Sequence, residues 1–181
     1  MLLTKNSTIQ RARFLHNKFE HKLSSMKTAV FVDVQNIYCT TRDIFKRSFN
    51  YKRFWNQVES NNEIILANAY AVDKGDEKQK KFQYALQTIG FNVKLKPYIS
   101  RKDGSAKGDW DVGITIDILD SAEKAEKIVL LSGDGDFDLL LQKVINKHGC
   151  IVHLYGVKEL TSNSLIESAS KFFPISNYFL I

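Results

Sequence analysis

Aspartate residues recur at three places where one segment of the chain gives way to the next. Asp33 ends an apolar run in VFVDVQN, Asp109 and Asp111 stand in KGDWDVG, and Asp134 and Asp136 stand in LLSGDGDF. Carboxylates gathered from such segments repel one another unless a cation lies between them. Their oxygens are hard ligands that suit Mg²⁺ or Mn²⁺, which share their shells with substrate phosphate. The residues therefore favour metal-assisted chemistry, in which bound ions polarise a phosphate and generate a hydroxide nucleophile.

Each aspartate also has a structural interpretation. A carboxylate that ends an apolar strand is costly to bury without a partner, so we favour a functional role for Asp33. Asp109 has the position of a helix N-cap, and we favour capping there, with Asp111 in the first turn where the helix dipole stabilises it. Asp134 and Asp136 could equally well cap the helix that follows them.

Further residues near the aspartates have a functional or a structural interpretation, and some have both. Asn36 could orient a metal-bound water or contact a phosphate through its amide, and it could also be a helix N-cap. Ser132 could bond a ligand or close the strand-to-helix turn, and we expect Gly133 to supply backbone freedom there. Asp117 lies six residues after Asp111, about 240° round a helix, so we expect it to lie outside the ligand set or in solvent.

The positive charge is unevenly distributed. The formal net charge is +6, and residues 1–27 hold six basic residues against Glu20 alone. Residues 42–53 are basic with interleaved aromatics, which suits phosphate contacts and base stacking; a solvated helix face with its aromatics in the core is equally compatible. The second basic patch, residues 94–107, includes the candidate substrate-binding residues Arg101, Lys102 and Lys107.

Residues 1–26 form a basic extension that we predict to be an amphipathic helix outside the main sheet. They have the composition of an organelle transit peptide but lack an apolar core and a cleavage site. The two cysteines, Cys39 and Cys150, have no metal-ligand spacing, which favours a reducing compartment and a cytoplasmic location. No run approaches the roughly 18 apolar residues that a membrane span needs.

The elements that must position the aspartates alternate along the chain. Apolar runs predict strands at Thr28–Val34, Glu63–Val72, Phe91–Pro97, Lys127–Leu131 and Cys150–Tyr155. Helices are predicted at Ile37–Phe49, Tyr51–Ser60, Glu77–Ile89, Asp109–Ala122, Asp136–Lys147 and Leu160–Ala169, and 99–107 is predicted to be a polar loop. This alternation indicates an α/β domain with a parallel sheet, whose strand carboxyl ends form the expected ligand site.

Several sharper motifs are excluded. Asp134–Asp138 resembles the start of an EF-hand loop, but Leu139 and Ile145 occupy the positions that need Gly and Glu. The chain has neither a GxGxxG motif after a strand nor a P-loop. Gln35 stands where a phosphatase with an aspartyl nucleophile would need a second carboxylate.

The blocks VFVDVQNI, KGDWDVGITIDIL and VLLSGDGDFDLLL, in this order and spacing, resemble the NYN domain family, especially its LabA-like branch, within the PIN-like nuclease superfamily. The resemblance covers about residues 28–173 and implies a Rossmann-like three-layer α/β/α sandwich with a central, mainly parallel sheet over residues 27–181. It also implies a Mg²⁺-type acidic pocket of Asp33, Asp111, Asp134 and Asp136, with Asn36 as a polar companion. Asp111 is preferred to Asp109 because VGITIDI aligns from it.

These observations together predict a metal-dependent ribonuclease that cuts RNA with metal-activated water. Mg²⁺ or Mn²⁺ is the expected cofactor, RNA the expected partner, and a homodimer is possible. One alternative is a non-catalytic, regulatory RNA-binding module of the same fold. A phosphoesterase that acts on a small nucleotide is the other.

Overall fold

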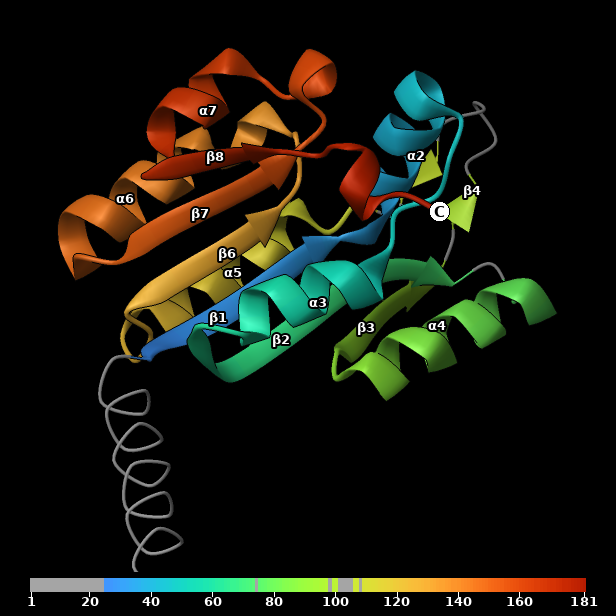
Figure 1. Ribbon diagram of the computed structural model, residues 1–181, viewed down its shortest axis with the longest axis horizontal. Helices are drawn as coiled ribbons and strands as arrows, with labels where there is room; N and C mark the ends of the chain where they lie inside the picture. The colour runs from blue at the N-terminus through green and yellow to red at the C-terminus, as the bar shows by residue number, and fades with distance from the viewer. Residues whose placement is uncertain (1–24, 74, 98, 101–105, 108) are drawn as a thin grey trace, which may run out of the picture.

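A parallel sheet forms the centre of the molecule (Figure 1), as the alternation of strands and helices predicts. The computed structural model describes residues 25–73, 75–97, 99–100, 106–107 and 109–181. Within them the six-stranded sheet has the order β3-β2-β1-β6-β7-β8. Its strands are β1 (Met26–Asp33), β2 (Asn62–Asp73), β3 (Asn92–Pro97), β6 (Lys127–Leu131), β7 (Ile151–Gly156) and β8 (Lys171–Pro174). All neighbouring pairs are parallel, so every carboxyl end lies at one edge.

Helices cover both faces of this sheet. On one face lie α2 (Val34–Phe45), α3 (Tyr51–Glu59) and α4 (Glu77–Ile89), and on the other lie α5 (Asp111–Ala122), α6 (Asp138–His148) and α7 (Asn163–Ser168). β1 serves both layers, because Val30 and Val32 enter the first core while Ala29 and Phe31 enter the second. A strand buried on both faces must be apolar throughout, which explains its uninterrupted apolar run. The predicted three-layer sandwich is confirmed.

The strand order reverses between β1 and β6. The chain adds β2 and β3 on one side of β1 and then crosses to build β6, β7 and β8 on the other. At such a reversal the connections leave in opposite directions and open a crevice at the carboxyl ends of the two strands. Asp33 is the last residue of β1, and Ser132 directly follows β6. The fold thus brings the first and third aspartate segments together.

Two sheet elements were not predicted. β8 has the sequence KFFP and no buried residue; it is an edge strand too short and too exposed to give an apolar run, and Pro174 is tolerated at that edge. The segment predicted to be a loop contains a short antiparallel pair, β4 (Ile99–Ser100) with β5 (Ala106–Lys107). Strands of two residues are too short for alternation to be detected.

Some predictions lie outside the described residues. These are the amphipathic helix over residues 1–26, apart from its last two residues, and the substrate-binding roles of Arg101 and Lys102. Only the backbone of Lys107 is described, in β5. Among the helices that the structure does describe, none combines the length and apolar character that crossing a bilayer requires.

Candidate metal centre

Asp33 is the last residue of β1 and directly precedes α2. Its Oδ1 accepts the backbone N–H of Asn36 at 3.0 Å, so Asp33 is the N-cap of α2. The prediction that Asn36 could be this cap is therefore wrong, and the helix starts three residues earlier than predicted because Asp33 caps it. The other oxygen, Oδ2, accepts the Ser132 hydroxyl at 3.4 Å. These two bonds fix the carboxylate at the crevice between β1 and β6.

Asn36 and Ser132 connect α2 to the turn after β6. The Asn36 Oδ1 accepts the backbone N–H of Gly133 at 2.9 Å, and the Ser132 Oγ accepts the backbone N–H of Asp134 at 3.2 Å. Ser132 is fully buried, so it closes the turn and also supports Asp33. The Asn36 amide nitrogen has no hydrogen-bond acceptor among the residues that the structure describes, and it remains a donor for a ligand.

Gly133 has a different role from the one predicted. Its φ is not positive, in contrast to Gly75, Gly90 and Gly149, so backbone freedom is not what the turn requires. A Cβ there would lie 2.9 Å from the carbonyl oxygen of Leu160 and 3.1 Å from the Thr161 Oγ1. The turn thus needs a glycine because another segment of backbone passes directly over it.

Three carboxylates converge beyond this turn. Asp134 caps the short 3-10 helix η1 (Gly135–Phe137) by accepting the backbone N–H of Asp136 at 3.1 Å. Asp111 is the first residue of α5. One oxygen of each of Asp111, Asp134 and Asp136 lies within 4.8 Å of the others. Asp111 and Asp134 are half-buried, while Asp136 is exposed, so the group opens to solvent.

Asp109 does not join this group. The N-cap of α5 is Trp110, which makes no side-chain capping bond, so the predicted capping role of Asp109 is wrong. The Trp110 ring instead packs edge-on against Tyr70, and its Nε1 donates to the carbonyl oxygen of Ala71 at 2.9 Å. The start of α5 is therefore fixed by an aromatic anchor on the sheet.

A second anchor lies further along α5. The Asp117 carboxylate accepts the Tyr70 hydroxyl and forms an ion pair with Lys94 at 2.6 Å. Asp117 lies outside the group of three, as predicted, but the expectation that it could be solvated is wrong. Together with Trp110 it fixes the position of α5 on the sheet, and hence that of Asp111.

The sequence profile of the NYN domain family matches residues 27–176. The chain belongs to the NYN domain family. The resemblance carried by the three aspartate-containing blocks is thereby confirmed, and the acidic cluster of this NYN domain lies at the carboxyl edge of the sheet.

Two similar proteins agree with this assignment. The chain is 30% identical over 126 residues to the Low amplitude and bright protein LabA of Synechococcus elongatus, which covers 64% of this chain and 66% of LabA. The chain thus spans slightly less than two thirds of that relative. A crystal structure of a Vibrio parahaemolyticus protein of unknown function is 45% identical, with a TM-score of 0.83, over 87% of this chain and 98% of the other.

The electrostatics of this NYN domain fit a bound cation. Burial, together with the charges of Asp111 and Asp134, raises the pKa of Asp33 to about 6, although the Asn36 N–H opposes the shift. Burial and the charges of Asp134, Asp109 and Asp136 likewise raise the pKa of Asp111. No described basic residue forms an ion pair with Asp33, Asp111, Asp134 or Asp136. Mutual repulsion that the charge of Lys96 offsets only in part, among donors that are all oxygen, suits Mg²⁺ or Mn²⁺.

Two aromatic residues of the basic segment 42–53 are not available for base stacking. Its aromatics Phe49 and Tyr51 are buried in the first core, together with Phe54 just beyond, so they cannot stack on bases. Two exposed rings near basic residues of this segment are instead Tyr38 and Tyr178, at 57% and 56% exposure. Arg42 lies over the first ring and Arg53 over the second, each at 5.8 Å from the centroid. Nothing in the sequence singled out either tyrosine.

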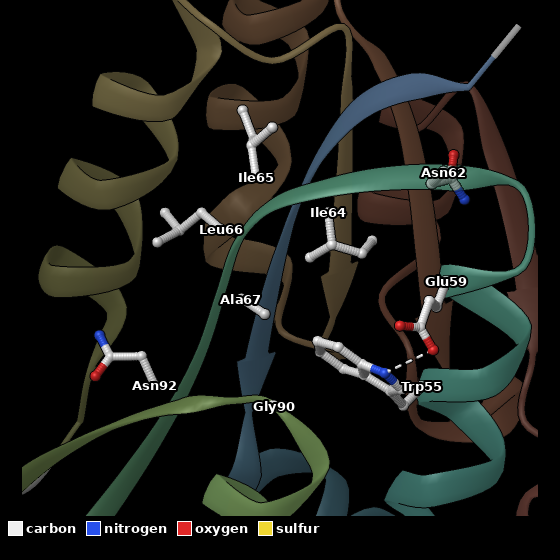
Figure 2. Close-up of a pocket in the computed structure, with 9 residues that line it drawn as sticks. All are labelled: Trp55, Glu59, Asn62, Ile64, Ile65, Leu66, Ala67, Gly90 and Asn92. Carbon is white, nitrogen blue, oxygen red and sulfur yellow. Dashed lines mark hydrogen bonds between the residues drawn. The ribbon is translucent and has the colours of Figure 1, made fainter. Parts of the chain in front are cut away.

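A pocket of about 470 Å³ lies away from the carboxylates. Figure 2 shows it between Trp55 and Glu59 of α3 and the first half of β2, with Gly90 and Asn92 beside it. These residues lie towards the amino end of β2 and include none of the cluster. The pocket is thus separate from the candidate metal centre.

Proposed function

We propose that this NYN domain is a divalent-metal-dependent ribonuclease. The observation that carries the proposal is the convergence of Asp111, Asp134 and Asp136 within 4.8 Å at the carboxyl edge of the sheet. Asp33 lies close enough for the charges of Asp111 and Asp134 to raise its pKa. Membership of the NYN family, within the PIN-like nuclease superfamily, supports a nucleic-acid substrate.

The side chains divide into ligands and supports. Asp111, Asp134 and Asp136 would hold Mg²⁺ or Mn²⁺, with Asp33 as a further ligand on the β1 side. A cation held there would polarise a phosphate and lower the pKa of an attacking water. The Asn36 amide nitrogen would donate to that water or to a phosphate oxygen, because its carbonyl oxygen is already occupied by Gly133. Ser132 would keep Asp33 in position.

RNA is the substrate that the surroundings favour. Two exposed tyrosines, Tyr38 and Tyr178, each have an arginine over the ring and offer base-stacking surfaces next to phosphate-binding charge. They come from α2 and the C-terminal end of the chain, which lie towards the edge that the strands point to (Figure 1). Since Cys39 and Cys150 are free thiols, we place the activity in the cytoplasm.

A non-catalytic RNA-binding module is the second candidate. It is favoured by the hydrogen bonds of Asp33 and Asp134, since both carboxylates cap helices and would have a structural role without any metal. In such a module the carboxylates would repel phosphate, and replacing Asp33 would leave RNA affinity unchanged or raise it.

The deciding experiment is cleavage of a fluorescent single-stranded RNA by the full chain in Mn²⁺, Mg²⁺ or EDTA. Asp134→Asn and Asp111→Asn should both abolish metal-dependent cutting. Asp120→Asn is the matched control, because Asp120 is exposed on the same helix as Asp111. Cutting that survives both substitutions would remove the assigned site. Binding without cutting, in every metal, would favour the binding module.

A further inference from the structure

Two lysines of β3 point to the same face of the sheet but have different partners. Lys94 and Lys96 are two residues apart on a strand, and such residues share a face. Lys94 is neutralised by Asp117 at 2.6 Å. Lys96 is nearer the carboxyl end of the strand, which is the edge where the carboxylates lie.

Lys96 is held in place without being neutralised. Its Nζ donates to the backbone carbonyl oxygen of Asp109 at 3.0 Å and lies 4.4 Å from the centroid of the Trp110 ring. Neither partner carries a full negative charge. An ammonium has three donors, and within the part of the chain that the structure describes only one of them is used.

Lys96 acts electrostatically on the acidic cluster, although its side chain forms no ion pair with the carboxylates in the described part of the chain. Lys96 lowers the pKa of Asp111, but burial and the three neighbouring carboxylates outweigh it and the net shift is upward. Among the described residues Lys96 forms no ion pair with these carboxylates, since its ammonium is bonded to the Asp109 carbonyl oxygen and lies on the Trp110 ring. Both contacts are with the two residues that precede Asp111, so its charge remains available to an anion that approaches the cluster.

We propose that Lys96, held against Trp110, is a phosphate-binding residue for the nucleic acid on which the carboxylate cluster acts. The assignment rests on the proposed function, because it takes the ligand to be a nucleic-acid phosphate. An anionic phosphate must approach an acidic pocket, and a fixed cation at its rim offsets the repulsion on that path. Trp110 links the two features, since it precedes Asp111 and also supports the Lys96 ammonium.

The test is the salt dependence of RNA binding by the full chain. Binding of a short fluorescent oligouridylate is measured against salt concentration in Mg²⁺, with Asp134→Asn present throughout to prevent cleavage. Lys96→Gln removes the charge but keeps a donor for the Asp109 carbonyl oxygen. It therefore separates a loss of phosphate binding from a loss of the hydrogen bond that holds the start of α5. Lys96→Arg restores the charge. Lys80→Gln is the matched control, because Lys80 is exposed on α4 and its one ion pair among the described residues is with Glu77.

Lys96→Gln should lower the slope of log affinity against log salt by about 0.7, the value for one single-strand phosphate contact. Affinity should fall about fivefold for every sequence tried, as expected for one exposed charge contact. Lys96→Arg and Lys80→Gln should leave the slope unchanged. A slope for Lys96→Gln equal to that of Lys80→Gln overturns the assignment, as does a wild-type protein that binds no nucleic acid.

The two proposals can fail separately. Wild-type protein that binds RNA without cutting it in any metal, together with a reduced slope for Lys96→Gln, supports the phosphate contact and removes the nuclease. Metal-dependent cutting with an unchanged slope supports the nuclease and removes the contact. Thermal unfolding of each variant checks that Lys96→Gln is folded; if it is not, the slope of Lys96→Met is compared with that of Lys80→Met.

Discussion

The Asp33 carboxylate is at once a helix cap and a partly buried acidic group with a raised pKa. It caps α2, yet burial and its acidic neighbours raise its pKa to about 6 from the ordinary value of 3.8. The folded protein therefore binds this proton more tightly than the unfolded chain does. The corresponding contribution to stability is fully present below about pH 4 and is lost as pH rises through about 6. Above that pH the metal-free protein carries a buried charge that destabilises it.

Asp33→Asn should therefore stabilise the metal-free protein near pH 8. The gain is at most about 2–3 kcal/mol, because a shift of two pKa units corresponds to about that amount. The amide oxygen can still cap α2. Urea unfolding in EDTA measures the difference, which should disappear near pH 4, with Asp120→Asn as the control. In saturating Mn²⁺ the wild-type protein should become more stable than Asp33→Asn, since the wild-type protein binds the ion more tightly. No gain in EDTA at pH 8 would contradict the raised pKa.

Gly133 gives a second prediction at the same scale. Gly133→Ala adds a methyl group 2.9 Å from the Leu160 carbonyl oxygen and 3.1 Å from the Thr161 Oγ1. We expect a loss of about 1–3 kcal/mol in the free energy of unfolding, as for overpacked sites. Because Gly133 also donates to Asn36, metal-dependent cleavage should fall as well. A loss below about 0.5 kcal/mol, the range of ordinary surface substitutions, would show that the turn adapts.

Among the elements, α5 determines where Asp111 lies. Trp110→Phe keeps an aromatic ring on Tyr70 but removes the bond to the Ala71 carbonyl. We expect unfolding to become easier by about 1 kcal/mol, the usual net value of one hydrogen bond. Mn²⁺ affinity, measured by calorimetric titration, should fall too, because Asp111 follows Trp110 directly. Trp55→Phe is the control, since Trp55 bonds Glu59 far from the cluster. Equal metal affinity in the two variants would contradict the anchoring role.

The elements that the sequence predicted best are those with strong burial patterns. β1 and β6 are buried on both faces and appear as apolar runs, whereas β8 is half-exposed and was missed. The buried face of α3 also has a signal in the sequence. Tyr51, Phe54 and Val58 recur at helical spacing, and that spacing indicates one buried face, which is what the structure has.

At the scale of the whole molecule, the carboxylates were predictable and their surroundings were not. A carboxylate after an apolar strand is visible in one segment, so Asp33, Asp134 and Asp136 could be named as candidates from sequence alone. The contact between Lys96 and Trp110 joins β3 to the segment before α5 and depends on their packing. Packing also explains why Asp111 rather than Asp109 lies beside Asp134 and Asp136, since the Trp110 ring, which bonds the sheet, fixes where α5 begins.

β3 covers only part of β2 beside the pocket, and this has a consequence for local dynamics. β3 pairs only with residues 68–73 of β2, so on that side residues 62–67 face no described strand. The register with β1 also shifts at Ile65, an irregularity that discourages further strands from adding to an edge. β2 is thus interior along one half and an edge along the other. In deuterated buffer, the backbone N–H groups of residues 62–67 that point away from β1 should exchange fast. Those of residues 68–72 that point towards β3 should exchange slowly. Uniform protection along β2 would mean that another group covers its open half.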